Sequence, residues 1–206
     1  IFERIYGENP YKSPMDMGVN MAGNCICDDA VCCEASNQEI IRRYYAALKG
    51  LVEGTSDENE VFKLKLLMNQ AHITIDARKV VQAALSRAKQ TKAPAAALEL
   101  EDGTIITGKT TPLLGASSAL LLNALKTLAG LDDELHLISP TVIEPIQKLK
   151  TEYLGSKNPR LHTDEVLIAL TISAVNDEDA NAAKHQLMNL EGSEAHFSVI
   201  LNESDE

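Results

Sequence analysis

The segment ALELEDGTIIT, residues 97–107, constrains the fold of this chain more than any other stretch. Two short β-prone runs flank Asp102-Gly103, the residue pair that two-residue hairpin turns prefer. A turn at these two residues places Leu100 opposite Ile105 and Leu98 opposite Thr107. Leu98, Leu100 and Ile105 then share one face of the hairpin. The chain is therefore predicted to contain a sheet built on this hairpin.

The same hairpin overlaps GTIITGKT, residues 103–110, which fits the phosphate-binding loop pattern G-x-x-x-x-G-K-[ST]. The match raises ATP binding through Gly103 to Thr110 as one hypothesis. Its context argues against it, because the first glycine is a turn residue and the intervening Thr-Ile-Ile-Thr is typical of a strand. Pro112 also follows too closely for a helix to begin at Lys109. We interpret the motif as the second strand of the hairpin.

Residues 1–92 have helical periodicity. Apolar residues recur at helical spacing between Asp28 and Lys49, from Asp57 onward, and again between Asp76 and Lys89. TKAPA then marks a change of period, which places a domain boundary near Ala93. We predict a helical bundle subdomain over residues 1–92.

Residues 93–206 alternate between strand and helix patterns. After the hairpin come an apolar helix over 115–130, a short strand within 134–140, and a helix over 141–155. Two more helices joined at Asn176 and a final strand within 194–201 complete the domain. The predicted fold class is α+β, with the helical subdomain followed by a three-layer α/β sandwich.

Composition excludes several function classes. The formal net charge of −11 opposes binding to nucleic-acid phosphates, and no basic run favours an anionic membrane. The longest apolar stretch is far shorter than a membrane span. Neither an HExxH motif nor a GxSxG elbow is present to supply a peptidase site.

All four cysteines, Cys25, Cys27, Cys32 and Cys33, lie in NCICDDAVCC. A disulfide framework spreads its cysteines along a chain, and this one does not. A zinc site is the alternative, but no CxxC pair is present and the nearest histidine is His72. We predict reduced thiols and no metal.

Several long blocks carry a family resemblance: NPYKSPMDMGVNMAGNCI, EASNQEIIRRYY, LLGASSALLLNALK, LISPTVIEPIQKLK and NPRLHTDEVLIAL. In this order they resemble the C-terminal part of uncharacterised protein family 0371, or domain of unknown function 1846, over nearly the whole chain. The resemblance implies a bacterial cytosolic protein and brings no established activity or cofactor. Members are longer, so it also implies that the chain is a fragment whose missing N-terminal region is a partner.

The layout of residues 93–206 also resembles the cytidine-deaminase-like sandwich. Such enzymes carry zinc ligands at the starts of two helices. Here the first start reads Gly115-Ala116-Ser117 and the second Pro140-Thr141, so the zinc ligands and the catalytic glutamate are absent. The layout implies parallel strands whose ends bring the two helix starts to one edge of the sheet. Exposed N–H groups there suit an anion.

We therefore predict that a small anionic metabolite is bound, or turned over, without zinc. Alternatives are an oligomerisation or regulatory module, which would require an apolar helical face around Ile40, Ile41 and Tyr44, and ATP binding as above. Arg160 and His162 precede a helix and would suit an anionic substrate and proton transfer. The candidate ligand-binding residues are Lys109, Ser117, Ser118, Thr141, Glu144, Asn158, Arg160 and His162.

Overall fold

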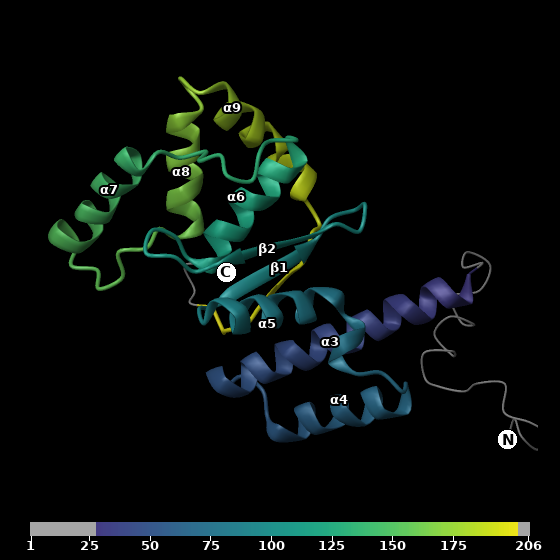
Figure 1. Cartoon of the computed structure of the whole chain (residues 1–206). Coiled ribbons are helices and arrows are strands. Elements are labelled where there is room, and N and C mark those ends of the chain that lie inside the picture. Colours follow the sequence, from purple (N-terminus) through teal and green to yellow (C-terminus); the bar gives the residue numbers. More distant parts are fainter. Residues whose placement is uncertain (1–27, 202–206) are drawn as a thin grey trace, which may run out of the picture. The chain divides into compact units, whose positions relative to one another are not determined.

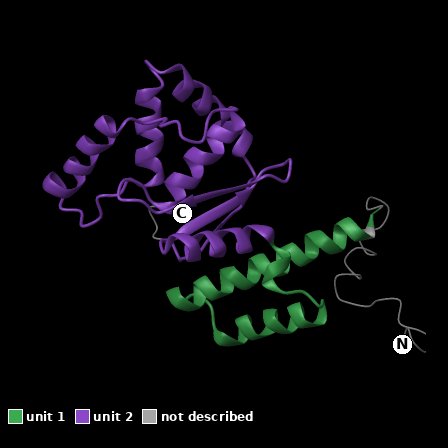
Figure 2. Ribbon diagram, viewed as in Figure 1, with its two compact units in different colours: residues 1–78 green, residues 79–206 purple. Residues whose placement is uncertain are grey.

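The computed structural model describes residues 28–201 and combines helices with a small sheet. The chain divides into two compact units between Arg78 and Lys79 (Figure 2). Within the described residues, no helix has both the length and the apolar character that a membrane span requires.

The described part of the first unit, residues 28–78, is helical. Its main elements are α3 (Asp29–Glu53), α4 (Glu58–Gln70) and the 3₁₀ turn η2 (Ile75–Ala77). Side-chain carboxylates cap both long helices at their N-termini, since Asp28 accepts from Val31 N at 3.1 Å and Asp57 from Glu60 N at 2.8 Å. Helix α3 packs on α4 through two clusters whose buried members are Ile40, Ile41, Ala47, Val61, Leu64 and Met68.

The second unit is built on a three-stranded antiparallel sheet. Its strands are β1 (Ala95–Glu99), β2 (Ile105–Lys109) and β3 (Ala195–Phe197), in the order β2-β1-β3. Helices α5 (Lys79–Thr91) and α6 (Ala116–Leu128) lie on opposite sides of this sheet (Figure 1).

The strand period explains this arrangement. Alternate β1 residues point to opposite faces, so Ala96 and Leu98 pack with Leu120 and Ala124 of α6, while Ala97 packs with α5. The change of sequence pattern predicts a domain boundary near Ala93. The compact units divide before α5, which packs on the sheet.

The remaining helices cover the far side of α6. They are α7 (Pro140–Lys148), which continues into the π-helix η3 (Leu149–Tyr153), then α8 (Thr163–Ser173), α9 (Glu178–His185) and the 3₁₀ helix η4 (Gln186–Leu190). Their shared core with α6 includes the fully buried side chains Leu125, Leu161, Val166 and Leu170.

The predicted hairpin is present, but its predicted register is wrong by one residue. Gly103 N donates to Leu100 O at 2.9 Å, and Leu100 N donates to Thr104 O at 2.9 Å, so the loop has three residues. Gly103 adopts φ +82°, the left-handed conformation that closes such loops. Leu98 therefore pairs with Ile106. A one-residue shift exchanges the two faces, so Ile106 faces α6 and Ile105 faces α5.

The predicted strand within residues 134–140 is also wrong. Residues 135–138 adopt no strand, and Ser139 already caps α7 by accepting from Thr141 N. Leu137 and Ile138 are buried against helices in the core of the second unit, which satisfies their apolar side chains without strand pairing. The described sheet therefore has no parallel strand, and the parallel pairing expected from the deaminase-like layout is absent.

Candidate functional site

A cavity of about 510 Å³ lies within the second unit, where α5, α6, the end of β2 and the start of α7 meet. Loops before α6 and before α7 complete its wall. Its apolar lining is formed by Leu113, Leu114, Leu122, Leu135, Leu137, Ile138 and Ile143. A volume of this size is in the range that holds a small organic ligand.

Three basic side chains from three different elements line the same cavity. They are Arg87 of α5, Lys109 at the end of β2 and Lys126 of α6, and the lining residues include one carboxylate, that of Asp133. Lys126 is 7% exposed and its Nζ donates to the backbone carbonyl of Asp133. The Nε of Arg87 is buried and has no hydrogen-bond partner among the described residues. The lining is thus cationic in a protein of net charge −11.

Three further polar side chains line the cavity: the imidazole of His136, the amide of Asn123 and the hydroxyl of Thr111. His136 is exposed on the loop before α7. Asn123 projects from α6 and its Nδ2 donates to Thr107 O on β2 at 2.9 Å. An amide and an imidazole can both donate hydrogen bonds to an anion.

Gly108 explains why α6 approaches β2 closely enough for these groups to meet. A Cβ at this position would lie 2.2 Å from Leu120 N and 2.5 Å from Leu120 Cα. The strand backbone therefore lies directly against α6, and any side chain here would separate the two elements. Lys109 follows as the last residue of β2 and reaches the cavity.

The fold thus requires both glycines of GTIITGKT for reasons unrelated to phosphate binding. Gly103 closes the hairpin, and Gly108 admits α6. Lys109 ends a strand, and the next helix begins only at Ala116. The prediction that no helix starts at Thr110 is confirmed.

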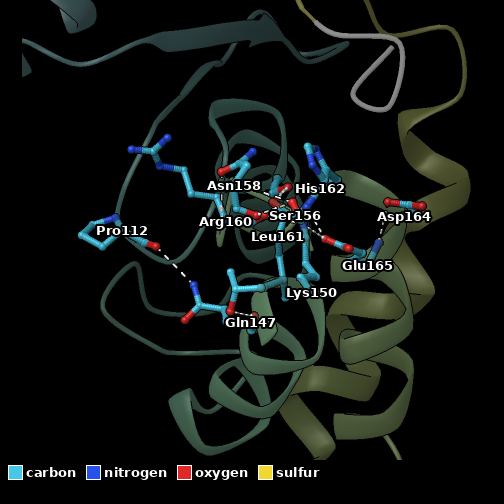
Figure 3. Close-up of polar contacts among 12 residues, drawn as sticks. Pro112, Gln147, Lys150, Ser156, Asn158, Arg160, Leu161, His162, Asp164 and Glu165 are labelled. Carbon is cyan, nitrogen blue, oxygen red and sulfur yellow. Dashed lines mark hydrogen bonds and ion pairs between the residues drawn. The ribbon is translucent and has the colours of Figure 1, made fainter. Parts of the chain in front are cut away.

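A second polar cluster lies at the start of α8 (Figure 3). Lys150 Nζ, from η3, donates to Glu165 Oε2 at 2.6 Å and to Arg160 O at 2.6 Å. The same Glu165 oxygen accepts from His162 N at 2.8 Å and so caps the helix. The Lys150 side chain is only 7% exposed, so the carboxylate of Glu165 is the counter-charge of a buried ion pair.

The loop before α8 is joined to the start of α6. Leu114 and Leu161 form a parallel bridge, with Leu161 N donating to Leu113 O at 3.0 Å and Gly115 N to Leu161 O at 3.3 Å. Ser118 Oγ also donates to Leu161 O, at 3.0 Å. The deaminase-like layout predicts that the starts of α6 and α7 lie close together at one edge of the sheet. The bridge in the structure joins the start of α6 to the loop before α8.

The predicted site residues separate into two groups. Lys109 lines the cavity. The others are placed elsewhere: Ser117 and Ser118 are buried in the first turn of α6, Thr141 and Glu144 are exposed on α7, and Asn158, Arg160 and His162 lie in the loop and cap before α8.

Bonds within the protein already use several of these groups. Arg160 Nε donates to Thr111 O at 2.9 Å, and Asn158 Oδ1 accepts from Arg160 N at 3.2 Å. Thr141 Oγ1 lies 2.8 Å from Ser139 Oγ. These contacts order loops and helix starts.

Sequence reasoning missed Arg87, Asn123, Lys126 and His136, and it interpreted His136 as structural. The available signal was the spacing of Asn123 and Lys126, three residues apart and hence on one face of an otherwise apolar helix. Arg87 carried no comparable signal, because a cation on an amphipathic helix is usually solvated.

The cysteine prediction is only partly within the described residues. Cys32 and Cys33 are half-buried near the start of α3, and Cys25 and Cys27 lie outside the described residues. Across residues 28–201, no group of three or more His, Cys, Asp or Glu side chains has the arrangement of a metal site. Metal content stays a prediction.

Comparison with known proteins identifies relatives along the whole chain. Residues 1–72 match the model of the domain of unknown function DUF1846, N-terminal, and residues 76–206 match its C-terminal counterpart. The junction of these two matches lies close to the junction of the two compact units.

Individual relatives are UPF0371 proteins. The one from Corynebacterium urealyticum is 55% identical over 206 residues, and the one from Corynebacterium aurimucosum is 56% identical over the same length. A protein of Streptococcus thermophilus is 52% identical over 205 residues. Each match covers all of this chain and 41% or 42% of the relative, so the chain spans about two fifths of their length. The chain belongs to the DUF1846 family, also described as UPF0371, as the sequence blocks predicted.

Proposed function

We propose that the cavity of the second unit binds a small organic anion. The observation that carries this proposal is the convergence of Arg87, Lys109 and Lys126 on one cavity. Like charges that line one cavity repel each other, and an anion between them would reduce that repulsion. In a protein of net charge −11, such a cluster requires a specific reason.

Arg87 adds a second argument. A buried donor without an acceptor destabilises the folded protein, and native proteins keep few of them. A carboxylate or phosphate oxygen in the cavity would accept from Arg87 Nε. Guanidinium groups suit both anions, because their donors match two oxygens at once.

The leucine-rich part of the lining indicates what else the ligand carries. Leu114, Leu122 and Leu137 would contact an apolar body attached to the anionic group. Burial of such a body contributes roughly 25 cal/mol per Å². Inorganic anions would leave this surface unused, so the proposed ligand is an organic acid or a phosphate monoester.

The proposal includes turnover of the ligand, with His136 as the side chain that transfers a proton. An imidazole is the side chain best suited to transfer a proton near neutral pH. It lines the cavity beside Leu135 and Leu137. The proposal also keeps the cytosolic location that the family resemblance implies.

The alternatives have weaker support. Ile40 and Ile41 are buried within the first unit, so they do not form the exposed apolar face that an oligomerisation module required. ATP binding through Gly103 to Thr110 lacks the helix that a phosphate-binding loop opens into. The deaminase-like layout is not needed for the proposal, which uses no zinc.

The test compares matched ligands on the full chain by thermal shift and isothermal titration calorimetry. We expect 4-methylpentanoate and 3-methylbutyl phosphate to stabilise the protein, and neutral 4-methylpentan-1-ol to have little effect. A ligand at 100 times its dissociation constant stabilises by about 2.7 kcal/mol. Equal binding of the alcohol would refute the proposal.

Variants locate the binding site. Arg87→Met and Lys109→Met should each weaken binding of the anions at least tenfold while the protein stays folded. Lys89→Met is the matched control, because Lys89 is exposed on the same helix and does not line the cavity. If all three variants bind as the unmodified chain does, the anion site lies elsewhere.

A further inference from the structure

The outer edge of β2 ends at Lys109, which lines the cavity. In the described sheet β2 is an edge strand, paired with β1 alone. An edge strand presents backbone N–H and C=O groups that can recognise an extended ligand.

The alternation of hydrogen bonds between β1 and β2 shows which β2 residues have backbone N–H and C=O groups on the outer edge. Leu100 N donates to Thr104 O at 2.9 Å, and at the other end Thr110 N donates to Pro94 O at 2.7 Å. In an antiparallel pair every second residue bonds to the partner strand. Counted in steps of two residues from the bonded positions Thr104 and Thr110, the backbone N–H and C=O groups of Ile106 and Gly108 point toward β1. Those of Thr107 and Lys109 point away from β1.

Asn123 connects this outer edge to the cavity lining. Its Nδ2 donates to Thr107 O at 2.9 Å, and Asn123 and Lys109 both line the cavity. Asn123 also blocks the carbonyl of Thr107. A strand that extended along β2 would need this carbonyl, whereas the N–H and C=O of Lys109 have no partner in β1.

We infer, on the basis of the proposed function, that the ligand is an N-acyl amino acid, in which an amide adjoins a carboxylate. The amide bonds to the backbone N–H and C=O of Lys109, and the carboxylate contacts the cationic side chains of Arg87 and Lys126. The amino-acid side chain lies on the leucine-rich lining.

The available backbone edge limits strand-like pairing to about one residue of the ligand. The cavity, with a volume of about 510 Å³, has room for a small organic ligand of this kind. Because Asn123 occupies the edge at Thr107, Lys109 is the cavity-lining position at which the outer edge is available. A peptide that added a full strand to β2 would find no continuous edge, because Asn123 occupies the carbonyl of Thr107.

The experiment uses isothermal titration calorimetry with the full chain and four matched probes. N-acetyl-L-leucine is 4-methylpentanoate with one added acetamido group, so the pair isolates the amide. We expect N-acetyl-L-leucine to bind at least tenfold more tightly than 4-methylpentanoate. N-acetyl-L-leucinamide lacks the carboxylate, and N-acetyl-N-methyl-L-leucine lacks the amide N–H. Both should bind at least tenfold more weakly than N-acetyl-L-leucine.

The outcomes separate this inference from the proposed function. If 4-methylpentanoate binds as tightly as N-acetyl-L-leucine, the amide inference is refuted and the anion site stands. If neither binds, both fail. If N-acetyl-L-leucinamide binds as tightly as N-acetyl-L-leucine, the carboxylate adds nothing to binding and the proposed anion site is refuted. In ¹⁵N-labelled protein, N-acetyl-L-leucine should shift the Lys109 amide resonance more than 4-methylpentanoate does, and equal shifts would also overturn the inference.

Discussion

Replacing Gly108 by alanine tests the close contact that holds α6 against β2. The added Cβ would lie 2.2 Å from the backbone nitrogen of Leu120, 2.5 Å from its Cα and 2.8 Å from its Cβ. No rotamer change can relieve contacts with backbone atoms. The helix must therefore move away from the strand, and the core between them must open.

The magnitude follows from this geometry. Overpacking a well-filled core destabilises by about 1–3 kcal/mol, occasionally more. Because the clash here is with backbone, we expect Gly108→Ala to lower the free energy of unfolding by about 3 kcal/mol or more. At about 2–4 °C per kcal/mol, the melting temperature should fall by at least about 6 °C.

Two other glycines serve as controls. Gly103→Ala forces alanine into φ +82°, which costs about 1–2 kcal/mol, although the nearest atom is Glu99 Oε1 at 3.8 Å. Gly115→Ala has no contact closer than 3.7 Å, so the change should stay below about 1 kcal/mol. Urea unfolding followed by far-UV circular dichroism ranks the variants, since the chain has no tryptophan to report by fluorescence.

The ranking separates two explanations of GTIITGKT. If close packing explains the glycines, Gly108→Ala should lower the free energy of unfolding most, followed by Gly103→Ala. A phosphate-binding loop predicts loss of nucleotide binding with little change in unfolding free energy. If Gly108→Ala unfolds at the same urea concentration as the unmodified chain, the packing argument is wrong.

Three further predictions concern other parts of the chain. Lys150→Met should destabilise by about 3 kcal/mol, because it leaves the Glu165 carboxylate without its cation, while exposed Lys148→Met changes little in the same urea titration. The N–H of Thr104 donates to Asp102 and holds the pKa of that carboxyl below its usual value, so its stabilisation is present above the unfolded pKa and lost as pH falls through the folded one. The stability difference between the unmodified chain and Asp102→Asn should therefore shrink between pH 7 and about pH 3, and a constant difference would contradict this reasoning. Reduced protein should contain no stoichiometric zinc, and elemental analysis that finds one zinc per chain would overturn the cysteine interpretation.

Much of the candidate site could not be predicted from the sequence. The sequence makes Lys109 a candidate because it belongs to the phosphate-binding loop pattern. In the structure it lines the cavity because it is the last residue of β2. Arg87 and Lys126 lie far apart in the chain, and neither belongs to a motif. Their convergence depends on α5 and α6 flanking the edge of the same sheet, which is a long-range property. Candidate residues near Arg160 were predicted as a group because they are neighbours in sequence.

The sequence by itself determined features that depend on near neighbours. Carboxylate caps at Asp28 and Asp57, the hairpin at Asp102-Gly103, the helix closed by Gly130 and family membership all follow from residues close together or from long matching blocks. Such interactions span three or four residues, so the local chain is sufficient.

Only the tertiary structure decided the register and the pairing of distant segments. The left-handed conformation of Gly103 set a three-residue loop, which exchanged Ile105 and Ile106 between faces. Leu137 and Ile138 have the composition of a strand, yet they are buried among helices and do not enter the sheet. Apolar burial is non-directional, so the same residues can satisfy it as strand or loop. Which one forms depends on the surfaces that the rest of the chain brings against them.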